Sequence, residues 1–180
     1  MRDQRVKKIA ISGLLIAIGL LIPMFSPVKL VLEPASFTLA SHVAIFIAIF
    51  ISPAVAVSVA AGTAIGFLLG GFPIIIVFRA ATHIIFALLG SLYIYKRKDS
   101  LSGVNLRIFS LCVALIHAFC EFVVVSFFYF EGNISPAHFE QGFAMSVLLL
   151  VGLGTVIHSM IDFEIAHLIL LPLKKTEFIK

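Results

Sequence analysis

Two pairs of polar residues stand out in a chain that is otherwise strongly apolar. Arg79 is followed four positions later by His83, and His117 is followed four positions later by Glu121. Residues four apart share one face of a helix, so each pair can present a charged group and an imidazole to the same neighbour. Arginine keeps its proton in proteins and its planar guanidinium matches carboxylates. Arg79 therefore needs an acidic partner or an anionic ligand.

A third polar group consists of Thr38, Ser41 and His42. It adds two hydroxyl groups and another imidazole at the start of a separate apolar run. Ionisable side chains within a membrane are costly and usually functional, so each of these groups is a candidate for a site. Brought together, the three groups would form a small pocket of mixed charge.

The same residues admit structural interpretations. Arg79 and Glu121 can form an internal ion pair that fixes helix packing, and Asp162 in the last apolar run offers a second carboxylate for Arg79. His42 and His83 can each serve in ordinary hydrogen bonds between helices. The sequence leaves ligand binding and internal pairing open at these positions.

A metal-dependent enzyme within the membrane is an alternative of another class. His117 and Glu121 would supply two metal ligands from one helical face, and His83 or His42 would complete the site. The sequence contains no His-Glu-x-x-His motif and no recognisable Ser or Cys nucleophile motif. It therefore favours binding over catalysis, with no cofactor and no metal ion expected.

Composition indicates that the elements holding these groups lie in a membrane. Of 180 residues, 61% are hydrophobic and 12% are charged, and the mean hydropathy is +1.17. Soluble domains carry about a quarter charged residues and disordered chains are poorly hydrophobic, so both classes are excluded. Nucleic-acid binding is disfavoured because the basic residues lie in short clusters at the edges of apolar runs. Cys112 and Cys120 lie in one run and are expected to be buried thiols.

Six apolar runs predict an all-α, six-helix membrane bundle that forms a single transmembrane domain over residues 1–180. A helix needs about 20 residues to cross about 30 Å of hydrocarbon. The second run is short for a span, and the sixth is long enough to tilt. The predicted spans are residues 9–25, 37–51, 54–69, 74–95, 106–130 and 143–171.

Basic residues predict the orientation of this bundle. Four precede the first span, four flank the connection between the fourth and fifth spans, and three follow the sixth. An even number of spans places all three groups on one side, which the positive-inside rule makes cytoplasmic. Both termini are therefore expected in the cytoplasm. Residues 26–36, 70–73 and 131–141 would then form the outer loops.

Small residues at four-residue spacing predict two helical faces that permit close approach. The first set, expected to pack helices within the chain, is Gly62, Gly66 and Gly70. The second set lies in the first span and is equally suited to internal packing or to contact with another protein: Ala10, Gly13 and Ala17.

Two segments give the chain a family resemblance. They read LEPASFTLASH over residues 32–42 and FRAATH over residues 78–83. Together with six spans in 180 residues and a first helix rich in small residues, they resemble the substrate-binding S-components of energy-coupling factor (ECF) vitamin transporters. The niacin-specific group is the most similar. The resemblance covers nearly the whole chain, although only these two segments are specific.

This resemblance implies a partner and a place in the cell. An S-component of this kind captures a vitamin at the outer face of the bacterial plasma membrane and docks on a transmembrane T-component driven by two ATPase subunits. The docking face would map onto Ala10, Gly13 and Ala17. The chain carries no nucleotide-binding motif of its own, so it would depend on those partners for energy.

The residue chemistry agrees with a small aromatic carboxylate. Arg79 would bind the carboxylate of nicotinate, imidazole or hydroxyl groups would meet the ring nitrogen, and phenylalanines would form the walls. Pantothenate also carries a carboxylate and is the alternative vitamin, whereas thiamin is a cation and is disfavoured. The expected ligand-binding residues are Arg79, His83, His42, Thr38, Glu121 and His117.

Overall fold

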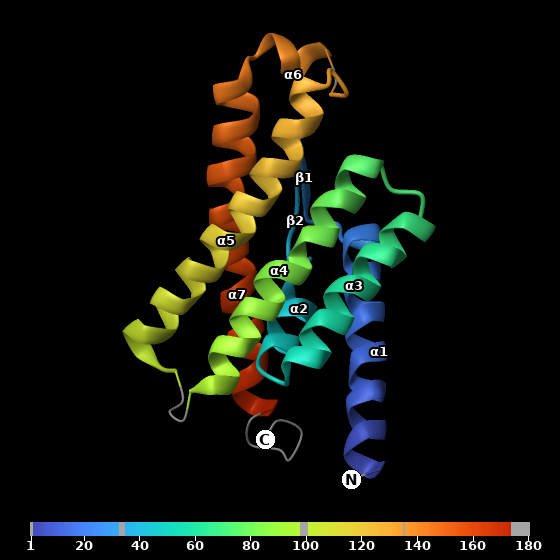
Figure 1. Ribbon diagram of the computed structural model, residues 1–180, viewed down its shortest axis with the longest axis vertical. Coiled ribbons are helices and arrows are strands. Elements are labelled where there is room, and N and C mark those ends of the chain that lie inside the picture. Colours follow the sequence, from blue (N-terminus) through green and yellow to red (C-terminus); the bar gives the residue numbers. More distant parts are fainter. Residues whose placement is uncertain (1, 33–34, 98–100, 135, 174–180) are drawn as a thin grey trace.

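The computed structural model describes residues 2–32, 35–97, 101–134 and 136–173, and it is an elongated bundle of helices with one hairpin (Figure 1). In chain order its elements are α1 (Arg2–Phe25), β1 (Lys29–Leu32), β2 (Ala35–Thr38), α2 (Val43–Ile49), α3 (Pro53–Leu69), α4 (Ile74–Lys96), α5 (Gly103–Phe130), α6 (Pro136–Glu140), the π-helical segment η1 (Ala144–Leu153) and α7 (Gly154–Leu173). Several residues used in the sequence interpretation lie outside the described residues: Glu33, Pro34, Lys98, Lys174, Lys175 and Lys180.

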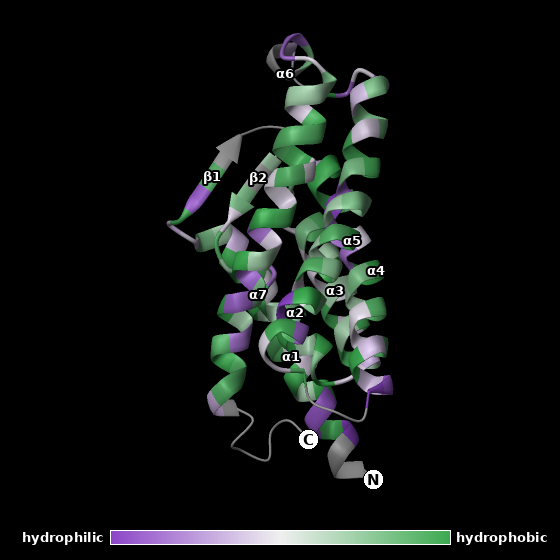
Figure 2. Cartoon of the chain, turned by 90° about the vertical axis from the view of Figure 1, so that its left-hand side faces the viewer, coloured by the Kyte–Doolittle hydropathy of each residue, from purple (hydrophilic) through white to green (hydrophobic). Residues whose placement is uncertain are grey.

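The predicted all-α class is confirmed, and within the described residues four helical stretches are long and apolar enough to cross a membrane. They are Arg5–Phe25, Ile74–Lys96, Gly103–Phe130 and Ala144–Pro172. Helix α3 is apolar but shorter, at 17 residues. Large apolar side chains cover the outer faces of the long helices, and hydrophobic residues extend along their length (Figure 2). Such a surface suits lipid and not water.

The segment predicted as the second span begins differently from the prediction. Residues 37–38 belong to β2, which pairs antiparallel with β1 in the register Lys29↔Thr38, and helix α2 has only seven residues. Tertiary contacts replace the first helical turn, because the Asp162 carboxylate accepts the backbone N–H groups of Ala40 and His42 at 2.7 and 2.9 Å. Ala40 also has a φ of 66°, which no continuous α-helix contains.

The predicted sixth span contains a change of helix type. The π-helical segment η1 runs over Ala144–Leu153 and passes into α7 at Gly154. A π-helical turn shifts the faces of the residues that follow it and often occurs beside functional sites. The faces of α7 are therefore not those that a uniform α-helix over residues 143–171 would present.

Glycines of α3 let α1 approach closely. A Cβ atom on Gly62 would stand 2.6 Å from Ile16, and one on Gly66 would stand 3.1 Å from Leu20. These two glycines lie at an internal contact, as one would expect for helix packing. Gly70 follows the last residue of α3 and caps that helix.

The other set of small residues lies on the outside of α1. Ala10, Gly13 and Ala17 are exposed, and a Cβ atom added to Gly13 would meet nothing within 4 Å. Among the described residues, this face of α1 therefore packs against no other helix.

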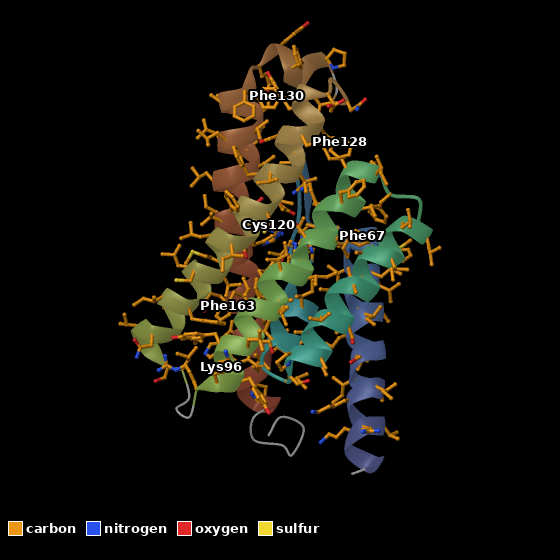
Figure 3. All side chains as sticks on the ribbon, viewed as in Figure 1. Phe67, Lys96, Cys120, Phe128, Phe130 and Phe163 are labelled. Atoms are coloured by element: carbon orange, nitrogen blue, oxygen red, sulfur yellow. The ribbon has the colours of Figure 1, made fainter. Side chains whose placement is uncertain are left out.

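The first and last long helices have their outer ends at the same end of the molecule. Helix α1 begins and α7 ends at the same end of the molecule, whereas α6 lies at the opposite end (Figure 1). Lys96, the last residue of α4, also lies toward the end where α1 begins (Figure 3). The basic residues at the start of α1 and at the end of α4 thus lie toward the same end of the molecule.

One of the two thiols is not where the sequence placed it. Cys120 is buried as predicted, but Cys112 is exposed on α5, so the prediction of two buried thiols was wrong for Cys112. Eight residues of helix turn about 80° beyond two full turns, so one of these side chains can face the bundle while the other faces outward.

Candidate functional site

A pocket of about 60 Å³ lies between the hairpin and helices α3, α4, α5 and α7. Its apolar walls come from Pro23, Phe37, Phe67, Phe72, Ile76 and Ala80. Its polar lining consists of Lys29, Thr38, Ser41, His42, Thr63, Arg79, His83, Glu121, Thr155 and His158. Apolar walls with a small set of convergent polar groups are typical of small-molecule sites.

A buried ion pair joins α4 to α5 at this pocket. Arg79 Nη2 donates to Glu121 Oε2 at 2.9 Å, and both side chains are less than a tenth exposed. The Thr155 hydroxyl on α7 donates to the same oxygen at 2.8 Å. The internal pairing that the sequence left open is therefore present, and Glu121 is the carboxylate in it.

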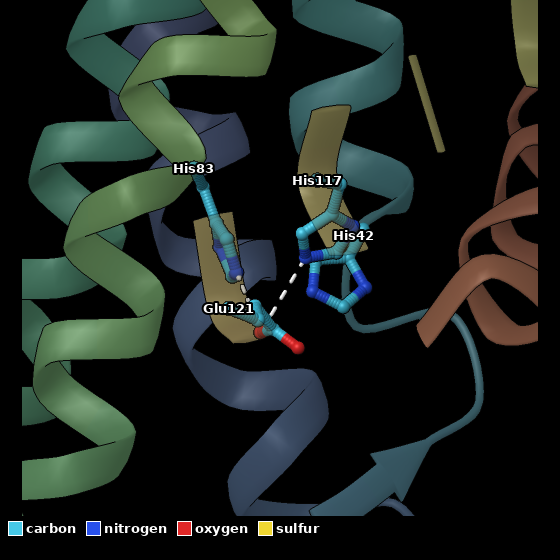
Figure 4. A group of neighbouring side chains, drawn as sticks. All are labelled: His42, His83, His117 and Glu121. Carbon is cyan, nitrogen blue, oxygen red and sulfur yellow. Dashed lines mark hydrogen bonds and ion pairs between the residues drawn. The ribbon is translucent and has the colours of Figure 1, made fainter. Parts of the chain in front are cut away.

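The second oxygen of Glu121 faces two imidazoles. His83 Nε2 lies 3.3 Å from Glu121 Oε1, and His117 Nε2 lies 3.4 Å from the same atom (Figure 4). The two predicted pairs, one on α4 and one on α5, thus converge on a single carboxylate.

Asp162, the second carboxylate that the sequence left open for Arg79, holds the turn before α2, and Glu121 is the carboxylate that pairs with Arg79. Asp162 Oδ2 lies 3.0 Å from His42 Nδ1 and accepts the His42 backbone N–H, while Oδ1 accepts the N–H of Ala40. The Ser41 hydroxyl lies 3.1 Å from His158 Nε2. Asp162 therefore fixes both the turn before α2 and the orientation of the His42 ring.

Three imidazole rings surround that of His42, which makes a cluster of four. The His42 ring centroid lies 4.7 Å from those of His83 and His117 and 5.1 Å from that of His158. His83 and His117 are themselves 4.7 Å apart. These rings come from α4, α5, α7 and the turn before α2, so the tertiary fold alone assembles them.

Comparison with known proteins places the chain in a family. No protein-family model matches the sequence, and no solved structure matches it. The niacin transporter NiaX of Lactococcus lactis subsp. cremoris (strain MG1363) is 39% identical over 166 residues, which cover 92% of this chain and 73% of that protein.

The chain belongs to the NiaX family. The resemblance to niacin-type S-components that the two sequence segments indicate is therefore confirmed at the level of the family. Family membership and the membrane-capable helices together establish a multi-pass membrane protein.

In this NiaX-family chain, five of the six expected ligand-binding residues line the pocket. They are Thr38, His42, Arg79, His83 and Glu121. His117 does not line it and lies behind Glu121 and His42.

Sequence reasoning missed several lining residues of the NiaX-family pocket. Lys29 on β1 had one signal, because it is the lone basic residue in the predicted outer loops. Thr63 and Thr155 are hydroxyl residues within apolar helices and carry no local signal. Phe37 enters the lining because residues 35–38 form a strand and not a helix.

Two buried polar atoms of the lining have no hydrogen-bond partner among the described residues. They are Thr63 Oγ1 and His83 Nδ1, on side chains that are 2% and 5% exposed. Buried polar atoms are normally paired, so unpaired ones at a pocket indicate where a guest molecule or water would bind.

Proposed function

We propose that this NiaX-family chain is the vitamin-binding subunit of an ECF-type importer and that it binds nicotinate in the pocket beside Arg79. The observation that carries the proposal is a buried guanidinium at a small, aromatic-walled pocket. Nicotinate is a planar ring with one carboxylate, which matches both features. The name of the relative, a niacin transporter, supports the same vitamin.

Charge favours an anionic guest. Lys29 and Arg79 bring two positive charges to the pocket lining, and Glu121 brings one negative charge. Among the Lys, Arg and Glu side chains of the lining, positive charge is therefore in excess. A carboxylate would gain charge-assisted hydrogen bonds there, whereas a cation would be repelled.

The walls and the unpaired atoms suit the pyridine ring. Phe67 and Phe72 stack on each other with centroids 4.6 Å apart, which gives that side of the pocket a flat apolar surface. The unpaired hydroxyl of Thr63 can donate to a ring nitrogen. Pantothenate shares the carboxylate but lacks an aromatic ring, so it fits these walls less well.

A transport function also accounts for the position of the hairpin and for the exposed small residues of α1. The hairpin lies away from the end where α1 begins and α7 ends, so a cytoplasmic location of that end would open the pocket toward the outside (Figure 1). The exposed small face of α1, with Ala10, Gly13 and Ala17, is available for a T-component and its two ATPase subunits. Membership of a transporter family favours this role over a membrane enzyme that uses His117 and Glu121.

The proposal is tested by ligand binding to the purified chain in detergent. Calorimetric titration with nicotinate, nicotinamide and pantothenate should give the highest affinity for nicotinate. Arg79→Ala should weaken nicotinate binding by about 2–5 kcal/mol, the range for truncating one partner of a buried charge pair, and should change nicotinamide binding much less. Arg79→Lys should recover only part of the loss. Arg107→Ala is the matched control, because that arginine pairs with Glu164 at the surface.

A different outcome would assign Arg79 to structure alone. Equal losses for nicotinate and nicotinamide, together with a lowered melting temperature that Glu121→Gln restores in the double variant, would remove Arg79 from the ligand site. Higher affinity for pantothenate would replace nicotinate as the vitamin.

A further inference from the structure

Three imidazoles and one carboxylate converge at the part of the pocket that His42, His83 and Glu121 line. All four side chains are buried, and each offers one ligand atom. These four atoms lie within 4.8 Å of one another (Figure 4), and they belong to His42, His83, His117 and Glu121. The set comes from the turn before α2, from α4 and from α5. Imidazole nitrogen and carboxylate oxygen are the ligands that zinc and related divalent ions take in proteins.

Two distances at Glu121 equal those between neighbouring ligands of a tetrahedral metal ion. Ligand atoms at about 2.0–2.1 Å from a tetrahedral zinc ion stand about 3.3–3.4 Å apart. Glu121 Oε1 lies 3.3 Å from His83 Nε2 and 3.4 Å from His117 Nε2. Charge-assisted hydrogen bonds are shorter, at about 2.7–2.9 Å. These two contacts therefore match edges of a tetrahedral ligand set.

His117 supplies a second, independent observation. The residue is completely buried, and its Nε2 has no hydrogen-bond partner among the described residues. Its Nδ1 lies 3.2 Å from the Ser159 hydroxyl. In the tautomer whose Nδ1–H donates to Ser159, Nε2 carries a lone pair. A buried lone pair that faces a carboxylate oxygen is unfavourable without a cation between them.

The groups behind the ligands also suit a metal ion. Asp162 Oδ2 holds Nδ1 of His42, which directs the other ring nitrogen away from Asp162. Glu121 Oε2 is held by Arg79 and Thr155, which leaves Oε1 for a ligand bond. Metal-binding histidines in proteins commonly have such a carboxylate behind them, and metal-binding carboxylates are commonly hydrogen-bonded in this way.

From these observations we propose that His42, His83, His117 and Glu121 bind one divalent transition-metal ion of the zinc class. Four protein ligands would close a tetrahedral site, so the ion would tie the turn before α2 to α4 and α5 and form the floor of the pocket. The inference does not depend on which vitamin enters the pocket, and it assigns the chain a metal site that the proposed transport function does not require.

The proposal is tested by loading the purified chain with metal in a buffer that contains no vitamin. The chain is stripped with a chelator, equilibrated with Zn²⁺, freed of unbound ion and analysed for metal content. We expect one zinc per chain and, after loading with Co²⁺, the intense visible absorption of tetrahedral cobalt. His117→Gln should lose this stoichiometric binding, whereas His167→Gln, a histidine of α7 outside the group, should keep it.

A second group of possible metal ligands lies next to this site. It consists of His42, His158 and Asp162, whose ligand atoms also lie within 4.8 Å of one another. A second variant distinguishes the two sites. His158→Gln should keep its zinc. Loss of zinc in His158→Gln with full binding in His117→Gln would overturn the proposal, as would a wild type that retains no zinc.

X-ray absorption of the zinc-loaded wild type gives an answer even if a variant fails to fold. Four nitrogen and oxygen ligands with an imidazole signature would support the site. A sulfur ligand or six-fold coordination would overturn it.

Discussion

The ring of Phe37 lies against Gly154, so closely that a Cβ atom on Gly154 would stand 2.6 Å from the Cζ atom of the ring. Phe37 belongs to β2 and forms part of the pocket wall, and Gly154 is the first residue of α7. The same ring has its centroid 5.5 Å from that of His158. The hairpin can therefore lie over the pocket because residue 154 has no side chain.

Gly154→Ala should displace Phe37 and weaken vitamin binding. Overpacking a close contact costs about 1–3 kcal/mol, and here the cost falls on the element that covers the pocket. Calorimetric titration with nicotinate measures the effect. Gly152→Ala is the matched control, because its added Cβ would meet only the Val147 carbonyl oxygen at 3.8 Å. Equal affinities in the two variants would show that the hairpin does not need this contact.

Asp162→Ala should destabilise the chain far more than Glu164→Ala. Asp162 is fully buried and accepts the backbone N–H groups of Ala40 and His42, so its loss leaves buried donors unpaired at about 1–3 kcal/mol each. Glu164 pairs with Arg107 near the surface, where an ion pair contributes about 0–1 kcal/mol. Melting temperatures in one detergent compare the two variants. Similar shifts would mean that Asp162 does not hold the turn.

Gly13→Leu and Gly62→Leu should separate docking from folding. Gly13 has open space around its Cα, so a leucine there should leave the melting temperature and nicotinate affinity unchanged while abolishing co-purification with a T-component and ATPase subunits. Gly62 faces Ile16 at the α1–α3 contact, so a leucine there should lower the melting temperature. Normal co-purification of Gly13→Leu would place the docking face elsewhere.

The orientation of the bundle can be read from cysteine labelling in intact cells. Because Cys112 is exposed, both native cysteines are first replaced. In that background a membrane-impermeant maleimide should label Glu140→Cys, at the α6 end, and leave Ser102→Cys, just before α5, unlabelled. The reverse pattern would place the termini outside.

Local spacing was enough to predict the helices and the pairs that they carry. The apolar runs are long, so the existence of α1, α4, α5 and the last helical stretch follows from composition alone. His83 lies one helical turn from Arg79 and Glu121 one turn from His117, and a four-residue spacing puts each pair on one face in any α-helix. The two pairs indeed face the same pocket region.

Tertiary packing decided which groups meet. The sequence offers Arg79 two carboxylates, and only the depth and rotation of the helices select Glu121 and leave Asp162 to His42. The start of α2 escaped sequence reasoning because the turn before it is held by Asp162, which lies 122 residues away from Ala40. Lys29 and Thr63 join the lining for the same reason. Periodicity fixes the face of a residue along its own helix, whereas the partner on that face depends on contacts between segments that are distant in the sequence.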